Sequence, residues 1–383
     1  MDIIPRILTE TIKEKQKRGF INLIYGPRRV GKTVLLQQLT KSIGKEQIIW
    51  FNGDNQETRD VLSQTSQLLL SGLIKEKKYI IIDEAQRIPN IGLSLKILID
   101  NFPKKIFYVT GSSSLMLSRG LQEPLTGRTI KYHLFPLSTK EMTNEIQKHQ
   151  IGALLEKQLL YGGYPYLQQL NKAEDKREYL KSLIQDYLFK DVLELKDITS
   201  PENLKKLTIL LAFQLGSEAS LNELANNLGV DVKTVKRYLS LLKQSFVIFE
   251  LGAFSRNLRK EVVKSKKYYF WDLGIRNALI DQFLPTDVRP DTGQLWENFL
   301  ASERIKKHEY QRRPRQYYFW RTYEQAEVDW IEGKGGKIEA YKFKWKQKKS
   351  FTPKLFWETY QVKAKTISKE NYLDFTNAAP KMT

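Results

Sequence analysis

The 383-residue sequence contains no cysteine and only three histidines. Disulfide bonds and thiolate metal sites are therefore excluded, and a metal site built from histidines is disfavoured. No run of apolar residues approaches the roughly 18 that a membrane-spanning helix needs. The polar residues 1–19 lack the apolar segment of a signal peptide. We therefore expect a cytoplasmic protein with no membrane partner.

Acidic residues are scarce relative to basic ones. The 63 Lys and Arg residues face 43 Asp and Glu residues, which gives a formal net charge of +20. Such an excess favours a polyanionic partner such as nucleic acid. Lysine used only to keep the protein soluble is the alternative explanation. With 41% hydrophobic and 28% charged residues, the chain has the composition of a folded protein, and its length allows two or three domains.

Residues 21–25, INLIY, have the pattern of a short buried strand, and a helical pattern begins after residue 33. Between them lies GPRRVGKT, which fits the phosphate-binding motif GxxxxGK[ST] in its expected strand–loop–helix setting. In such a loop, backbone N–H groups surround a triphosphate, the lysine reaches the β and γ phosphates, and the hydroxyl is a Mg²⁺ ligand. We therefore predict ATP and Mg²⁺ as cofactors. The predicted nucleotide-binding residues are Gly26, Pro27, Arg28, Arg29, Val30, Gly31, Lys32 and Thr33.

A second apolar run, YIII at residues 79–82, ends in Asp83 and Glu84. An acidic pair at the carboxyl end of a strand near the loop can hold Mg²⁺ and activate water. Asp83 would hold Mg²⁺ through water, together with Thr33, and Glu84 would orient or deprotonate the attacking water. The sequence therefore predicts an enzyme that hydrolyses ATP rather than one that only binds it.

Two further polar positions follow the strand pattern of residues 106–110. Ser112, or Ser113 beside it, is placed to sense the γ-phosphate, unless the Ser-rich stretch is an ordinary turn. Arg128 precedes another strand-like stretch at residues 130–135. An arginine there is either a surface cation or a finger that neutralises transition-state charge in the site of a neighbouring subunit.

Several segments, in order along the chain, resemble a prokaryotic branch of the AAA+ ATPases. They are GPRRVGKT, IIIDEAQRIPN, VTGSSSLMLSRGL, LTGRTIKYHLFPLS and YGGYPYL. In that branch the ATPase domain is followed by a conserved C-terminal region of nuclease-like fold, of the DUF4143 type. The resemblance implies an α/β fold whose parallel P-loop sheet has the strand order 5-1-4-3-2 and flanking helices. It also implies assembly into a homo-oligomeric ring and supports Arg128 as the finger.

Residues 203–285 have the pattern of a winged helix-turn-helix domain. Ser220 and Glu223 have capping-box spacing at the start of one helix, Gly229 makes the turn, and a second helix begins near residue 232. The residues expected at or near the major groove of DNA are Lys233, Thr234, Lys236 and Arg237, and those expected at phosphates are Arg256, Arg259 and Lys260. The alternative is a module that contacts only protein.

The C-terminal residues resemble a small α/β restriction-endonuclease-like domain, in which a helical Glu, a strand Asp and an ExK pair collect Mg²⁺ beside a phosphate. The positions that match are Glu297, Asp329 and Lys344. The acid expected two places before Lys344 is Lys342, which puts a positive charge where the cation would bind. Glu339 is a poor substitute because alternation places it on the opposite face of the strand. We therefore expect a degenerate site that does not cut DNA, with Lys342 and Lys344 as candidates for gripping nucleic acid.

The chain is thus expected to contain an AAA+ domain at 1–172, a helical connector at 173–202, a winged helix at 203–285 and an inactive nuclease-like domain at 286–383. The leading prediction is an ATP-hydrolysing, ring-forming motor or remodeller that binds DNA. Branched DNA such as a Holliday junction is its candidate substrate, by analogy alone. A nucleotide-dependent regulatory switch or protein-binding scaffold is the main alternative. An ATP-gated nuclease is the third, and Lys342 disfavours it.

Overall fold

The computed structural model describes residues 3–111, 124–144, 146–185, 200–255, 266–346 and 351–376. Contacts between residues divide the chain into two compact units. The first comprises Met1–Phe135 with Gln244–Phe246, and the second comprises Pro136–Lys243 and Val247–Thr383. Across the described stretches, no helix has the length and apolar character that a membrane crossing requires.

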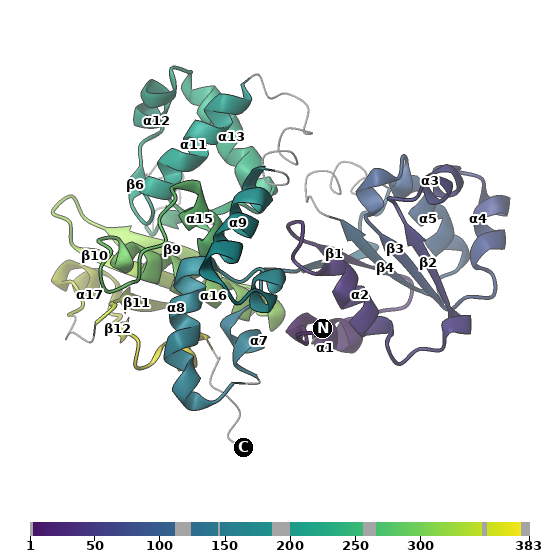
Figure 1. Ribbon diagram of the computed structural model, residues 1–383, viewed down its shortest axis with the longest axis horizontal. Coiled ribbons are helices and arrows are strands. Elements are labelled where there is room, and N and C mark those ends of the chain that lie inside the picture. The colour runs from purple at the N-terminus through teal and green to yellow at the C-terminus, as the bar shows by residue number, and fades with distance from the viewer. Residues whose placement is uncertain are drawn as a thin grey trace. The chain divides into compact units, whose positions relative to one another are not determined.

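A five-stranded parallel sheet forms the centre of the first unit (Figure 1). In spatial order its strands are β2 (Ile48–Asn52), β3 (Tyr79–Asp83), β4 (Ile106–Gly111), β1 (Ile21–Tyr25) and β5 (Thr129–His133). The first residue of β1, Ile21, lies opposite Phe107 of β4 on one side and Thr129 of β5 on the other. The predicted order 5-1-4-3-2 and the predicted α/β fold class are therefore confirmed.

Apolar side chains explain why these short segments form buried strands. A parallel sheet is covered on both faces, so its strands need apolar residues pointing both ways. β4 is buried along its whole length. Ile82 of β3 and Val109 of β4 share a core cluster with Leu70 and Leu95, which come from the helices over one face. On the other face α2 contacts β4, and α1 packs against α2.

The helices of this unit include α1 (Ile7–Lys15), α2 (Lys32–Thr40), α3 (Gln56–Leu62), α4 (Gln67–Ile74) and α5 (Ile91–Asn101), with 3-10 turns η1 (Lys45–Gln47) and η2 (Ala85–Arg87). α2 follows β1 directly after the glycine-containing loop, and η2 follows β3 directly after Glu84. Both predicted site segments therefore lie at the carboxyl ends of parallel strands. Ligands of open α/β sheets bind at that edge.

The second unit combines helices with a mixed seven-stranded sheet. Its helices include α7 (Thr139–Thr143), α8 (Ile151–Tyr161), α9 (Ala173–Leu183), α11 (Pro201–Phe213), α12 (Leu221–Leu228), α13 (Val232–Gln244), α15 (Leu273–Leu279), α16 (Thr292–Tyr310), α17 (Lys354–Tyr360) and α18 (Tyr372–Thr376), with 3-10 turns η3 (Lys148–Gln150) and η4 (Pro165–Gln169). The strands, in spatial order, are β12 (Ala364–Ile367), β11 (Lys337–Phe343), β10 (Glu327–Lys334), β9 (Gln316–Arg321), β7 (Ile248–Ala253), β8 (Lys266–Phe270) and β6 (Glu218–Ala219).

One sheet joins the helix-turn-helix segment to the C-terminal residues. β8 pairs antiparallel with β6 on one side and with β7 on the other, and β7 also pairs in parallel with β9. Gly252 of β7 lies opposite Tyr318 of β9. The boundary predicted at residue 285 therefore falls between two segments that share a sheet, and the contacts group both in a single unit.

The first unit ends at Phe135, whereas the sequence predicts an ATPase domain that runs to residue 172. Residues 136–172 pack within the second unit instead. α8 contacts α15, and Leu137 N donates to Gly163 O at 2.7 Å. Because these contacts are long-range, the local pattern from which the boundary was predicted contains no sign of them.

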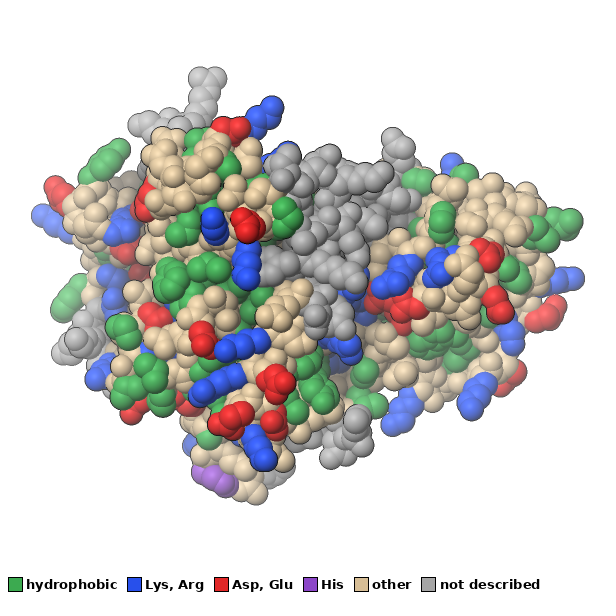
Figure 2. Space-filling model, turned by 45° about the horizontal axis from the view of Figure 1, so that its top comes forward, with side chains coloured by type: hydrophobic (Ala, Val, Ile, Leu, Met, Phe, Trp, Pro, Cys, Tyr) green, Lys and Arg blue, Asp and Glu red, His purple; other side chains and the backbone are tan. Residues whose placement is uncertain are grey.

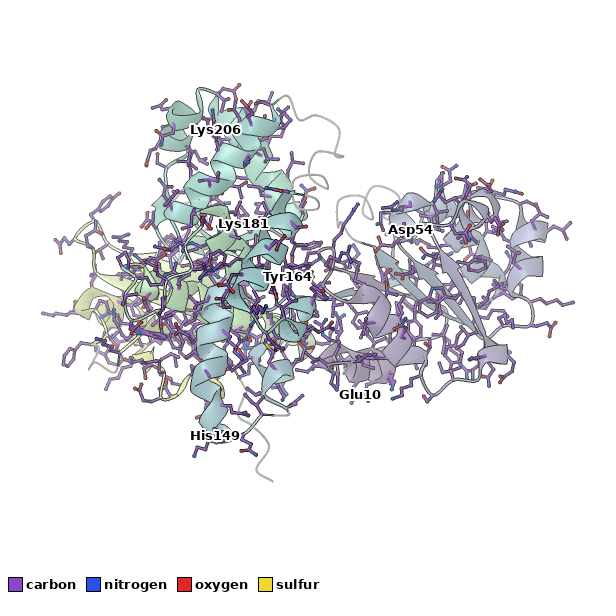
Figure 3. All side chains as sticks on the ribbon, viewed as in Figure 1. Glu10, Asp54, His149, Tyr164, Lys181 and Lys206 are labelled. Carbon is purple, nitrogen blue, oxygen red and sulfur yellow. The ribbon has the colours of Figure 1, made fainter. Side chains whose placement is uncertain are left out.

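The glycines of YGGYPYL permit this close packing; Figure 3 labels Tyr164 of the segment. Asp272 caps α15 by accepting from Ile275 N at 3.1 Å, and its other carboxylate oxygen accepts from Gly163 N at 2.7 Å. Burial raises the pKa of the Asp272 carboxyl. Gly162 has a φ of 75°, and a Cβ there would lie 2.1 Å from Asp272 Oδ1. The segment therefore joins α8 to α15, which is a structural role.

Candidate active site

The loop between β1 and α2, residues 26–31, has a backbone suited to an anion. Arg29 and Gly31 have positive φ angles of 61° and 97°. Left-handed positions alternating with ordinary ones turn successive N–H groups toward one side, which makes a concavity for anions. A Cβ on Gly26 would lie 2.2 Å from Leu134 O. Only glycine therefore fits where the loop begins.

Lys32, the first residue of α2, is 4% exposed. Its Nζ donates to Gly26 O at 3.2 Å and to Pro27 O at 3.0 Å. The ammonium is thus held beside the loop by the loop's own carbonyl groups. The N-terminus of α2 adds partial positive charge at the same place. A phosphate group that binds in the loop would meet both.

Thr33 and Asp83 meet although they are far apart in the sequence. Thr33 Oγ1 donates to Asp83 Oδ2 at 2.6 Å. Asp83 is buried at the carboxyl end of β3, and β4 lies between β3 and β1. The two predicted Mg²⁺ ligands therefore form one group at the edge of the sheet beside the loop.

This pair fits Mg²⁺, which prefers oxygen ligands and usually takes only one or two of them from protein. Nucleotide phosphates and water supply the others in phosphoryl-transfer sites. Among the residues that the structure describes, no group of three or more His, Cys, Asp or Glu side chains is arranged to hold a metal ion. Binding of Mg²⁺ at Thr33 and Asp83 would therefore depend on the bound nucleotide.

Glu84 follows Asp83 in the chain and has a left-handed backbone conformation. Its φ is 50°, in the left-handed region, and its N–H donates to Asp83 Oδ1 at 3.2 Å and to Thr110 Oγ1 at 3.1 Å. Its carboxylate Oε2 accepts from Gln86 Nε2 at 2.5 Å. A strained conformation of this kind persists only where surrounding contacts impose it, and it is common at functional sites. The two acidic side chains thus have different partners, as different roles require.

Thr110 is a site residue that sequence reasoning missed. It is buried near the end of β4, and its Oγ1 donates to Asp83 Oδ1 in a short hydrogen bond. The predicted γ-phosphate sensors, Ser112 and Ser113, lie outside the described residues. A polar residue at the end of the apolar strand IFYVTG was the available signal. Its meaning depended on β4 lying next to β3, which the local sequence does not state.

Arg128 lies at the end of the sheet where its parallel strands begin, whereas the loop lies at the end where they finish. It precedes β5, and its carbonyl accepts from the N–H of Ile21, the first residue of β1. The loop begins after the last residue of β1, roughly 13 Å farther along at about 3.3 Å per residue. The guanidinium pairs with Asp100 on α5, and the side chain is 39% exposed. Arg128 therefore does not lie beside the phosphate-binding loop of its own chain.

The predicted helix pair of residues 220–244 is present as α12 and α13. Ser220 caps α12, where its Oγ accepts from Glu223 N at 3.3 Å. Thr234 N donates to Asp231 Oδ1 at 2.6 Å at the start of α13. On α13, Lys233 and Lys236 are exposed, and Arg237 is half-buried over the ring of Tyr238.

The remaining predicted DNA contacts are dispersed. Arg256, Arg259 and Lys260 lie outside the described residues. Lys342, on β11, and Lys344, just after it, are half-buried. Lys344 N donates to Ile367 O at 2.9 Å, which continues the pairing of β11 with β12.

Glu297 and Asp329 belong to a buried charge cluster on the second sheet. Lys267 of β8, whose side chain is 2% exposed, pairs with Glu297 Oε1 at 2.9 Å and Glu327 Oε1 at 2.5 Å. Tyr269 Oη also donates to Glu297 Oε1, at 2.5 Å. Burial, and then the charge of Glu297, raise the pKa of Asp329 to about 7, although Phe343 N donates to Asp329 Oδ2 at 2.6 Å.

This cluster contains an ammonium that the sequence interpretation did not include. That interpretation placed the ammonium of Lys342 near the carboxylates, which stays a prediction. The structure places the Lys267 ammonium there, with Glu297 and Glu327 as its partners. Lys267 lies within residues 203–285, the predicted winged helix, where basic side chains are expected to contact solvent or DNA.

Family models match three stretches of the chain. The AAA domain matches residues 18–143, a domain of unknown function (DUF8612) matches residues 152–286, and another (DUF4143) matches residues 292–375. The chain therefore contains a stretch that matches an AAA domain, followed by a C-terminal stretch that matches DUF4143. The match to the AAA domain supports an ATPase that binds nucleotide.

Relatives of this chain occur in bacteria and archaea. An uncharacterized protein of Mycobacterium tuberculosis is 29% identical over 331 residues, which cover 85% of this chain and 70% of that protein. An uncharacterized protein of Methanocaldococcus jannaschii is 27% identical over 281 residues, which cover 69% of this chain and 63% of that protein.

Two solved structures have a low similarity to the chain. AMPPCP-bound DnaA from Aquifex aeolicus is 20% identical, with a TM-score of 0.30, over 62% of this chain and 86% of that one. Drosophila ORC bound to DNA is 11% identical, with a TM-score of 0.28, over 71% of this chain and 93% of that one.

Lys32→Ala and Glu84→Gln should affect different steps. Lys32→Ala removes the buried ammonium, so we expect nucleotide affinity to fall by roughly 2–5 kcal/mol, which is about 30-fold or more. Glu84→Gln keeps the loop intact and should leave affinity little changed, while turnover falls by roughly 10²–10⁴-fold. Calorimetric titration with ADP and a phosphate-release assay measure the two effects. Lys41→Ala, at an exposed position after α2, is the control, and equal losses of affinity in both site variants would contradict the assigned roles.

Proposed function

We propose that this chain is a Mg²⁺-dependent ATPase that binds DNA through its second unit and uses hydrolysis to move along or remodel that DNA. The observation that carries the hydrolytic part is the convergence of Thr33, Thr110 and the Glu84 N–H on the buried carboxylate of Asp83. This convergence, directly beside the phosphate-binding loop, is what a site that hydrolyses nucleotide needs.

In the proposed reaction, the loop amides and Lys32 bind the phosphates and compensate their charge. Thr33 and Asp83 would hold Mg²⁺, which supplies further neutralisation of charge on the β and γ phosphates. Thr110 keeps the Asp83 carboxylate directed at Thr33. Glu84, whose carboxylate is anchored by Gln86, orients the attacking water and accepts its proton.

The exposed face of α13 supports DNA as the partner. Lys233, Lys236 and Arg237 lie at i, i+3 and i+4 spacing on one side of the helix, while Val235 and Leu239 are buried on the other. In helix-turn-helix proteins the second helix enters the major groove. α13 is the second helix of its pair, and β6, β8 and β7 form the small sheet that a wing requires. The excess of basic over acidic residues favours the same partner.

DNA affinity should fall steeply with salt, and reversing charge on α13 should weaken it further. We expect Lys233→Glu with Lys236→Glu to lower affinity about tenfold or more and to reduce the salt slope by roughly two. Lys205→Glu with Lys206→Glu is a matched control, because both residues are exposed on α11 and carry the same charge. Figure 3 labels Lys206. Fluorescence anisotropy across a salt series measures both. Equal losses in the two double variants would contradict a contact through α13.

Branched DNA is the proposed substrate. The ATPase rate should rise more with four-way and forked DNA than with duplex or single strands of equal length. No binding of the wild type to any DNA at low salt would favour the alternative, a nucleotide-dependent switch or scaffold that binds protein.

We also propose that the AAA domains assemble into a ring in which Arg128 serves the neighbouring site. Its place at the end of the sheet away from the loop supports action in trans. Arg128→Ala should leave nucleotide bound and lower turnover by roughly 10³-fold or more. Doped into wild-type protein, it should reduce activity more than in proportion to its share. Asp100→Ala removes the partner of Arg128 and is the control, because it should retain turnover. A linear mixing curve would contradict a finger in trans.

The second unit is proposed to hold DNA without cutting it. The Lys267 ammonium, with Glu297 and Glu327 as its partners, is a cation that chelators cannot remove. A second cation placed beside it would be repelled. We expect no specific cleavage of junction or forked DNA with Mg²⁺ or Mn²⁺, with or without ATP, in a gel assay. Cuts made by the wild type that disappear in Asp329→Ala would show a working nuclease.

A further inference from the structure

Arg6 is a buried arginine beside the phosphate-binding loop, and the mechanism above does not use it. It is 4% exposed. Its NH1 donates to Val30 O at 2.7 Å, and its NH2 donates to Phe135 O at 2.6 Å. Val30 lies inside the loop, and Phe135 follows β5. One guanidinium therefore joins the N-terminal segment, the loop and the end of a neighbouring strand.

The hydrogen bond to Val30 O fixes one peptide group of the loop. A trans peptide is planar, and its C=O and N–H point in opposite directions. The carbonyl of Val30 and the N–H of Gly31 belong to the same peptide group. Because the carbonyl faces Arg6, the N–H of Gly31 faces away from Arg6. A peptide group next to glycine rotates with little steric resistance, so its orientation depends on such a partner.

Arg6 is itself held in place by α2, the helix that follows the loop. Gln38 Oε1 accepts from Arg6 N at 3.1 Å and from Thr9 Oγ1 at 3.0 Å. Gln38 Nε2 donates to Ile4 O at 2.9 Å. The backbone at residue 6 is thus anchored to α2, while its side chain anchors the loop. The planar fork of a guanidinium suits two acceptors at once, and an ammonium does not reproduce it.

We propose that Arg6 is a positioning residue for nucleotide binding, which keeps the N–H of Gly31 directed at the phosphates by holding the carbonyl of Val30. Without Arg6 this peptide group can turn, and a carbonyl oxygen would then face the phosphate in place of a donor. The proposal concerns only the nucleotide site. It is independent of DNA binding and of ring assembly.

The test compares Arg6→Met, Arg6→Lys and Arg18→Gln in the full chain without DNA. Titration with ADP and with pyrophosphate gives the two Kd values. Arg6→Met should raise both by the same factor, about tenfold or more, because the hydrogen bond from the Gly31 N–H to a charged phosphate would be lost. Arg6→Lys should lie between Arg6→Met and wild type, since an ammonium can hold one carbonyl. Arg18→Gln, at an exposed position near α1, should leave both values unchanged.

The outcomes that would overturn the proposal are distinct. A folded Arg6→Met protein with unchanged Kd values would exclude a role at the phosphates. A loss confined to ADP, with pyrophosphate unaffected, would place the effect at the nucleoside. Thermal melts without ligand establish which variants fold. If both Arg6 variants are unfolded and ADP restores neither, the role of Arg6 is structural and the proposal fails.

Discussion

The carboxylate of Asp83 is the group on which the rest of the site depends. It is buried, and it accepts hydrogen bonds from Thr33, Thr110 and the N–H of Glu84. A buried carboxylate without partners costs several kcal/mol, whereas a hydrogen bond to a charged group contributes roughly 1.5–3 kcal/mol. These donors come from α2, from β4 and from the turn after β3. Thr110 reaches Asp83 because β4 lies next to β3, and Thr33 reaches it from the helix that follows β1, so the charge favours keeping these strands together.

The parts of the site that are local in sequence were predictable, and those that depend on neighbouring strands were not. The loop and the acidic pair could be recognised because each has its own strand and its own residue pattern. Thr110 was missed because its partner, Asp83, is on another strand. Arg6 was missed because its partners are the carbonyls of distant residues, and a carbonyl has no sequence signature. The strand order itself followed from resemblance rather than from any local pattern.

In the second unit, Lys266 and Lys267 are another case in which the local sequence does not predict the partners of a side chain. Successive residues of a strand point to opposite faces of the sheet. Lys266 therefore pairs with Glu250 at 2.9 Å and stays partly exposed, while Lys267 points into the buried cluster with Glu297. The sequence KSKKYYFW gives no means of telling these lysines apart. A buried ammonium needs such partners, so Lys267 links the helix-turn-helix segment to α16. Two segments predicted as separate domains thus share one sheet.

The basic composition is consequently a weaker sign of DNA binding than its size suggests. Lys32 and Lys267 are buried and have partners in the protein. Lys306 is also buried, and its Nζ lies 2.7 Å from Glu303 Oε1. On the face shown in Figure 2, Lys and Arg side chains are interspersed with Asp and Glu rather than gathered in one patch. A DNA footprint needs cations that are exposed and arranged along one element. Lys233 and Lys236 on α13 meet that condition. The case for DNA therefore depends on that helix rather than on net charge.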